Sequence, residues 1–124
     1  MSNKILVVDD EDIIRESLSY TLRNENYEVD EAANGKEAYS KLKESSYDLV
    51  ITDIEMPEMD GYALTAEIRR LEKSTGKSTP ILAITASDFD LTEERATVLG
   101  FDGYMLKPLD PDILEKKLAN LVCD

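Results

Sequence analysis

Four apolar runs in this chain are each followed directly by residues that can bind a metal ion or a phosphoryl group. The runs and the polar residues that end them are 4–8 with Asp9 and Asp10, 49–52 with Asp53, 81–84 with Thr85, and 103–106 with Lys107. If these runs are parallel strands of one sheet, their carboxyl ends lie along the same edge, where open α/β sheets place their ligand sites. The pattern therefore predicts three carboxylates, one hydroxyl and one ammonium group in a single crevice.

Helical patterns separate the apolar runs. Residues 27–32 alternate like an outer strand, and further helices are predicted over about 36–44, 62–73 and 91–99. The first helix, which ends at about residue 24, and the last, which Pro111 opens, carry apolar residues at helical spacing: Ile13, Ile14, Leu18 and Leu22, and Ile113, Leu114, Leu118 and Leu121. The four apolar runs are typical of parallel strands covered on both faces. The chain is therefore predicted to be an α/β protein, a doubly wound (βα)5 sandwich with right-handed crossovers.

Composition narrows the class of protein. With 124 residues, of which 42% are hydrophobic, the chain can build one core, so residues 1–124 are predicted to form a single domain. A net charge of -13 should repel nucleic acid and anionic membrane surfaces, which argues against direct nucleic-acid binding. No apolar stretch approaches the roughly 20 residues of a membrane-spanning helix, and the N-terminus lacks a signal-peptide pattern. We therefore predict no membrane insertion and a cytoplasmic location.

The residue types that are missing restrict the chemistry further. The chain has no histidine, and Cys123 is its only cysteine. These two facts exclude a Ser-His-Asp triad, a histidine-ligated zinc site, a Cys/His pair and an internal disulfide. Any metal ion must therefore be bound through oxygen.

The clustered acids predict a divalent cation and a phosphoryl acceptor. Ionised Asp9, Asp10 and Asp53 close to one another would raise each other's pKa unless a cation lies among them. All-oxygen ligation with few carboxylates is the Mg2+ pattern, although ligand type also admits Mn2+ or Ca2+. A carboxylate is already an ionised nucleophile at neutral pH, so Asp53 can attack a phosphoryl group without a general base. Mg2+ and Lys107 would neutralise the phosphoryl oxygens while Thr85 donates to one of them, and the product would be an aspartyl phosphate.

Taken together, the motifs resemble the receiver domain of two-component response regulators over essentially the whole chain. They are the acidic pair Asp9-Asp10, Asp53 followed by Met56-Pro57 and Asp60-Gly61, Thr85-Ala86, Tyr104, and Lys107-Pro108. Each motif is weak alone, but their order at successive strand ends is specific. The resemblance implies a flavodoxin-like sandwich with strand order 2-1-3-4-5. It also implies a phosphorylation-dependent signalling switch, which is not an enzyme although it assists its own phosphoryl transfer and autodephosphorylation.

The same resemblance implies a role for each residue at the acidic site. Asp53 would be the phosphoacceptor, and Mg2+ would be ligated by Asp10, Asp53 and the backbone carbonyl of Glu55. Asp9 would hold the metal's water shell or contribute a second carboxylate. Lys107 would pair with the phosphoryl group.

Four further positions would govern switching and the lifetime of the phosphorylated state. By the resemblance, Thr85 and Tyr104 form the switch and alter the surface of the fourth helix, fifth strand and fifth helix. Glu55 and Ser87 lie two residues after Asp53 and Thr85, where the family tunes access of the hydrolytic water. The alternative for Glu55 and Ser87 is that both are solvated polar residues at the rim of the site.

The partners implied by the resemblance are a sensor histidine kinase or a histidine phosphotransfer domain, which would donate the phosphoryl group. The stretches 56–64 and 107–109 resemble receivers at the C-terminal ends of hybrid sensor histidine kinases more than those of transcription factors. The chain is accordingly either a stand-alone regulator or a receiver cut from a larger protein. It is expected to be a monomer or a weak dimer.

Two alternatives compete with this interpretation. Taken singly, Thr85, Tyr104 and Lys107 can be explained structurally as a strand end, a core aromatic and a solvated charge. Asp53 alone could be a helix cap or a turn former. The joint occurrence of the four residues at the predicted sheet edge favours function over four separate coincidences. The alternative of another class is a haloacid-dehalogenase-type phosphatase that would use Asp9 as its nucleophile on external phosphate esters. Its Asp-x-Asp motif differs from the adjacent pair present here.

Overall fold

Helices and strands alternate strictly along the chain in the computed structural model, which describes residues 3–56, 59–76, 78–85, 93–107 and 109–121. The elements are β1 Lys4–Val8, α1 Asp12–Asn24, β2 Glu28–Ala32, α2 Gly35–Glu44, β3 Leu49–Asp53, α3 Gly61–Thr75, β4 Ile81–Thr85, α4 Glu93–Leu99, β5 Gly103–Leu106 and α5 Pro111–Leu121. Among the described helices, none is long and apolar enough to cross a bilayer. The predicted elements are thus all present, and the ends that can be compared differ by one or two residues. Residues 91 and 92, where the fourth helix was predicted to begin, lie outside the described residues.

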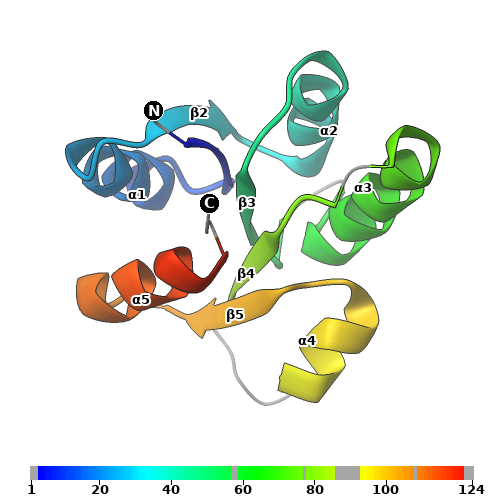
Figure 1. The fold of residues 1–124 in the computed structure, drawn as a ribbon. Coiled ribbons are helices and arrows are strands. Elements are labelled where there is room, and N and C mark those ends of the chain that lie inside the picture. The colour runs from blue at the N-terminus through cyan, green and yellow to red at the C-terminus, as the bar shows by residue number, and fades with distance from the viewer. Residues whose placement is uncertain (1–2, 57–58, 77, 86–92, 108, 122–124) are drawn as a thin grey trace.

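The five strands form one parallel sheet in the order β2-β1-β3-β4-β5 (Figure 1). Val8 at the end of β1 is in register with Thr52 of β3, and Asp53 is in register with Ile84 of β4. This register places Asp9, the residue after Val8, beside Asp53. The predicted fold class and strand order are confirmed.

Alternation of side chains along each strand creates two apolar cores, one on each face of the sheet. Leu6 and Val8 belong to the core that packs under α2, α3 and α4, whereas Ile5 and Val7 belong to the core under α1 and α5 (Figure 1). All four residues are fully buried. Since both faces are covered, the strand ends are the exposed edge on which a site can form.

Two helical isoleucines and most of β5 depart from the predicted core. Ile13 is 84% exposed and Ile113 is 49% exposed, although both were expected on the buried stripes of their helices. Adjacent residues lie about 100° apart around a helix, and on α5 the buried stripe contains Leu114 and Leu118 while Ile113 lies at its exposed side. In β5 only Met105 is buried, because this strand lies at the edge of the sheet and has one strand neighbour.

Arg69 of α3 fixes the position of α4 and β5 at the other end of the sheet. Its Nε and Nη2 donate to the carbonyl oxygen of Gly100 at 3.0 and 2.7 Å, and Nη1 donates to that of Thr79 at 2.8 Å. The guanidinium also pairs with Glu72 and Asp102, each at 2.8 Å. The turn between α4 and β5 is therefore anchored to α3 by a planar, multiply bonded group.

Candidate functional site

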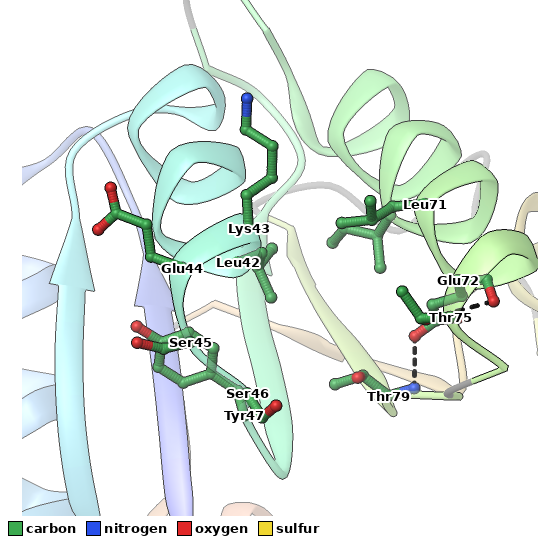
Figure 2. A pocket seen from close by; sticks show the side chains of 11 residues that line it. Leu42, Lys43, Glu44, Ser45, Ser46, Tyr47, Leu71, Glu72, Thr75 and Thr79 are labelled. Carbon is green, nitrogen blue, oxygen red and sulfur yellow. Dashed lines mark hydrogen bonds between the residues drawn. The ribbon is translucent and has the colours of Figure 1, made fainter.

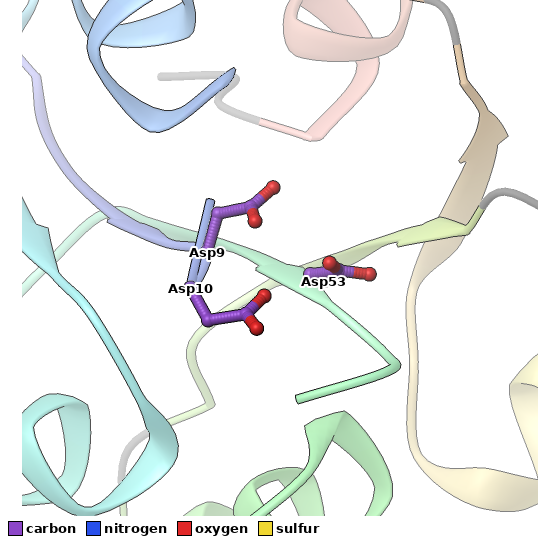
Figure 3. A group of neighbouring side chains, drawn as sticks. All are labelled: Asp9, Asp10 and Asp53. Atoms are coloured by element: carbon purple, nitrogen blue, oxygen red, sulfur yellow. The ribbon is translucent and has the colours of Figure 1, made fainter. Parts of the chain in front are cut away.

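Three carboxylates meet at the carboxyl ends of β1 and β3 (Figure 3). Asp9 and Asp10 follow β1 directly and Asp53 is the last residue of β3, and each offers an oxygen within 4.8 Å of the others. Asp9 and Asp53 are buried, with 0% and 3% of their surface exposed, whereas Asp10 is exposed. The structure thus brings together the three acids that the sequence predicted would converge.

Burial makes the Asp9 carboxylate costly to ionise. Desolvation raises the pKa of Asp9, and the charge of Asp53 raises it further. The amide of Glu11, which donates to Asp9 Oδ1 at 2.9 Å, and the ammonium of Lys107 both act in the opposite direction without cancelling the rise. A cation among these carboxylates would therefore be strongly favoured.

Lys107 supplies a positive charge to this cluster. Its Nζ donates to Asp53 Oδ2 at 3.0 Å and forms ion pairs with Asp9 Oδ2 at 3.3 Å and Glu11 Oε1 at 3.5 Å. Desolvation lowers the pKa of Lys107, but its hydrogen bond to Asp53 and the charges of Asp53 and Asp9 outweigh that effect, so the pKa is raised. The predicted convergence of Lys107 on the acids is confirmed, and the contact with Glu11 is an addition.

The donor set fits an oxygen-bound divalent ion. Apart from its ion pair with Lys107, the buried Oδ2 of Asp9 has no hydrogen-bond partner among the described residues. A buried carboxylate oxygen that accepts no hydrogen bond can accept a metal ion or a metal-bound water as a further partner. The side chain of Glu55 is exposed. The backbone amide of Glu55 donates to Asp53 Oδ1 at 3.3 Å, and this bond holds the Glu55 backbone next to the acidic cluster.

A glycine allows the chain after β3 to turn back against the strand end. The amide of Gly61 donates to the carbonyl of Ile54 at 2.9 Å. A Cβ at Gly61 would lie 2.6 Å from the carbonyl oxygen of Asp53, closer than real Cβ atoms approach. Asp60 then begins α3, since its side chain accepts from the amide of Ala63 at 2.9 Å. The Asp60-Gly61 motif therefore shapes the loop that follows Asp53.

The predicted switch residues lie on the neighbouring strands. Thr85 ends β4 and is 4% exposed, and its carbonyl accepts from the amide of Lys107 at 2.8 Å. Tyr104 of β5 is half-buried, and the Nζ of Lys117 lies 5.8 Å from the centre of its ring. Ser87 lies outside the described residues. Thr85 and Lys107 are thus tied together through their backbones.

Sequence reasoning did not assign a role to Arg15. Its guanidinium contacts the backbone of Asp9 and the carboxylates of Asp12 and Glu31. The carbonyl of Asp9 and the β2 residue Glu31 are tertiary partners, and no helical or strand period links them to residue 15. Only the Asp12 contact, three residues away on the same helix, follows from sequence spacing.

A pocket lies at the end of the molecule opposite the acidic cluster. It measures about 450 Å3 and lies between α2 and α3 (Figure 2). Tyr47, just before β3, and Thr79, just before β4, help to line it. It therefore opens at the amino ends of the strands and has no part in the acidic cluster.

The chain matches the response regulator receiver domain over residues 5–119. It is 40% identical over 111 residues to the transcriptional regulatory protein SrrA of Staphylococcus aureus, an alignment that covers 90% of this chain and 44% of SrrA. The chain therefore spans less than half the length of that relative.

Solved receiver structures have the same fold. The receiver of Ssk1 from Saccharomyces cerevisiae, crystallised with the histidine phosphotransfer protein Ypd1, has a TM-score of 0.90 at 28% identity and covers 98% of this chain and 90% of that one. The receiver of the sensor histidine kinase PA1611 from Pseudomonas aeruginosa, crystallised with a magnesium ion in its active-site cleft, has a TM-score of 0.88 at 29% identity over the full length of both chains. The chain belongs to the response regulator receiver domain family, the signalling domains of two-component systems.

The contacts of Lys107 lead to a stability prediction. In metal-free buffer, Lys107→Met should lower the free energy of unfolding by about 3 kcal/mol, because it leaves two buried carboxylates without their cation. Lys116→Met, which removes the same charge from an exposed position of α5, should be close to neutral. Urea unfolding of both variants measures the difference. Equal stability of Lys107→Met and wild type would show that the ion pairs contribute nothing.

Proposed function

We propose that this chain is the phosphoacceptor domain of a two-component phosphorelay and that Asp53 receives the phosphoryl group. The observation that carries the proposal is the 3.0 Å contact between Lys107 Nζ and Asp53 Oδ2, at a strand end where Asp9 and Asp10 also converge. A carboxylate beside a lysine can accept a phosphoryl group, because the ammonium is close enough to neutralise the negative charge of the added group.

The three acids would hold Mg2+. Asp10, Asp53 and the backbone carbonyl of Glu55 would be ligands, while Asp9 would hold a bound water or add a second carboxylate; Mn2+ satisfies the same oxygen donors. The magnesium ion in the cleft of the PA1611 receiver supports this assignment. When bound, the ion would neutralise charge on the transferred phosphoryl group.

The chain's own residues would perform the transfer without a general base. An Asp53 oxygen attacks phosphorus, and the bond from phosphorus to the donor's histidine nitrogen breaks with its electron pair, leaving the imidazole. Lys107 would move from the Asp53 carboxylate to an oxygen of the phosphoryl group. The negative charge would then lie on the phosphoryl oxygens of the aspartyl phosphate, where Lys107 would continue to compensate it.

An apolar groove beside the site suits a protein donor. The groove measures about 530 Å3 between α1 and α5, and its lining includes Ile13, Leu109, Pro111 and Lys107. Lys107 belongs both to this groove and to the acidic cluster, so a partner seated there lies next to Asp53. We propose that a sensor histidine kinase or histidine phosphotransfer domain docks on this face and uses the exposed Ile13. The co-crystal of the related Ssk1 receiver with Ypd1 supports a donor of that kind.

Phosphorylation would be transmitted through Thr85 and Tyr104. The hydroxyl of Thr85 would gain a charge-assisted hydrogen bond to the phosphoryl group, and the space it leaves would admit the Tyr104 ring. One such bond contributes about 1.5 to 3 kcal/mol, enough to shift a two-state population about ten- to a hundredfold. The surface of α4, β5 and α5 would change shape accordingly. Glu55 and Ser87 would control how easily water reaches the phosphoryl group and so how long it lasts. The cytoplasmic location and the monomeric or weakly dimeric state remain predictions.

The first test of this proposal is chemical. Acetyl phosphate with Mg2+ should place one acid-stable, base-labile phosphoryl group on Asp53, and a chelator should prevent it, because transfer requires the cation. Intact-mass spectrometry followed by peptide mapping measures the modification. Asp53→Ala should remain unmodified.

Two further variants separate this reaction from its alternatives. Ile13→Ser should be labelled by acetyl phosphate like wild type, because Ile13 lies outside the acidic cluster and the small donor needs no docking face. Asp9→Asn should still carry its label on Asp53. A phosphoryl group on Asp9, or sustained turnover of small phosphate esters, would instead support the haloacid-dehalogenase-type alternative, which the family assignment disfavours.

Metal binding should be visible as a gain in thermal stability. Mg2+ should raise the melting temperature of wild type, because it binds the folded acidic cluster and not the unfolded chain. Asp10→Asn should lose most of that gain, whereas Glu16→Gln, which removes a negative charge from an exposed position of α1, should keep it. Differential scanning calorimetry with and without Mg2+ measures the effect. An undiminished gain in Asp10→Asn would remove Asp10 from the metal site.

A further inference from the structure

Arg15 lies behind the acidic pair and uses three nitrogen atoms of its guanidinium. Nη1 donates to the backbone carbonyl of Asp9 at 2.9 Å, Nε to Glu31 Oε1 at 3.1 Å, and Nη2 to Asp12 Oδ1 at 2.7 Å. The side chain is 13% exposed, so these contacts are partly shielded from water. One planar group therefore joins the end of β1, the start of α1 and β2.

The connection that Arg15 holds is short and carries two of the three acids. Only residues 9–11 link β1 to α1. The amide of Asp9 donates to the carbonyl of Ala32 at 3.2 Å, and no side-chain hydrogen bond caps α1 at Glu11. The bond from Arg15 to the Asp9 carbonyl therefore restrains the peptide between Asp9 and Asp10, and the direction of the Asp10 side chain depends on that peptide.

The charge of Arg15 is a weaker explanation for its position. Asp12 and Glu31 both pair with the guanidinium, so most of its field is offset before it reaches the cluster. Lys107 already supplies a cation in direct contact with Asp9 and Asp53. What Arg15 adds is geometry, because its rigid fork fixes three segments at once, which a lysine cannot do.

We propose that Arg15 is a positioning residue for the divalent ion: it holds the Asp9 to Asp10 peptide so that both carboxylates are arranged for the metal before it binds. The inference rests on the proposed metal site. Mg2+ demands near-ideal octahedral geometry, so a small rotation of this peptide would weaken binding. Groups that orient metal ligands typically change metal affinity about ten- to a hundredfold when they are replaced.

Two substitutions of Arg15 separate geometry from charge. Arg15→Lys keeps the charge and loses the fork, whereas Arg15→Met loses both. The matched control is Arg23→Met, because Arg23 lies on the same helix, also contacts Glu31 and donates to the carbonyl of Val29 at 3.0 Å, away from the acidic pair. Isothermal titration with Mg2+ at low and high salt measures the affinity of each variant.

Both Arg15 variants should bind Mg2+ about tenfold more weakly than wild type at both salt concentrations, since a geometric effect is not screened. Arg23→Met should stay within about twofold of wild type. Wild-type affinity in Arg15→Lys would show that charge alone matters, and tighter binding by Arg15→Met would show that Arg15 merely repels the ion. Either result overturns the proposal, and Arg15→Lys decides alone if Arg15→Met fails to fold.

A metal-free measurement keeps the inference separate from the metal site itself. The amide of Glu11 donates to Asp9 Oδ1 at 2.9 Å, so its hydrogen exchange reports the order of this connection. Without metal, exchange at Glu11 should be about tenfold faster in Arg15→Lys than in wild type, in the same range as the expected loss of affinity. Unchanged exchange would overturn the positioning role. If wild type failed to bind Mg2+ while Glu11 responded as expected, the metal site would be wrong and the restraint would stand.

Discussion

The contact of Lys107 with the carboxylates of Asp53 and Asp9 is the interaction on which this site depends. Two buried carboxylates at adjacent strand ends repel each other and have lost most of their hydration, so the folded state needs a cation between them. Lys107 meets that need at 3.0 Å from Asp53 and 3.3 Å from Asp9. A divalent ion and a phosphoryl group would redistribute the same charges, which is why binding and phosphorylation can be coupled to structure here.

The rest of the fold positions these charged side chains. The parallel register brings Asp9 beside Asp53. The amide of Lys107 donates to the carbonyl of Thr85 at 2.8 Å, which holds the chain after β5 next to the end of β4. Gly61, which has no Cβ, allows the start of α3 to pack closely against the carbonyl of Asp53. At the other end of the sheet, Arg69 anchors the turn between α4 and β5 to α3.

The sequence predicted the sheet and its acidic edge because apolar runs and the residues that end them are local patterns. Asp53 and Lys107 could be placed together because parallel strands share one edge. Contacts between distant segments left no such pattern. The pairing of Arg15 with Glu31 joins helix α1 to strand β2, and the helical spacing of α1 does not predict which strand residue Arg15 contacts. The contact of Lys107 with Glu11 depends on the conformation of the loop between β1 and α1. The exposure of Ile13 was missed because Ile13 and Ile14 are both apolar, and spacing alone does not say which one faces the core.

The most direct measurement is a crystal structure of the chain with Mg2+ and beryllofluoride, which mimics a phosphoryl group on a carboxylate. Beryllium should be bonded to an Asp53 oxygen, and Lys107 Nζ and Thr85 Oγ1 should each lie within hydrogen-bond distance of a fluoride. Mg2+ should be ligated by Asp53 and Asp10, in an octahedral shell completed by oxygen atoms. Beryllofluoride bonded to Asp9, or Lys107 still paired with the Asp53 carboxylate and out of reach of every fluoride, would contradict the account.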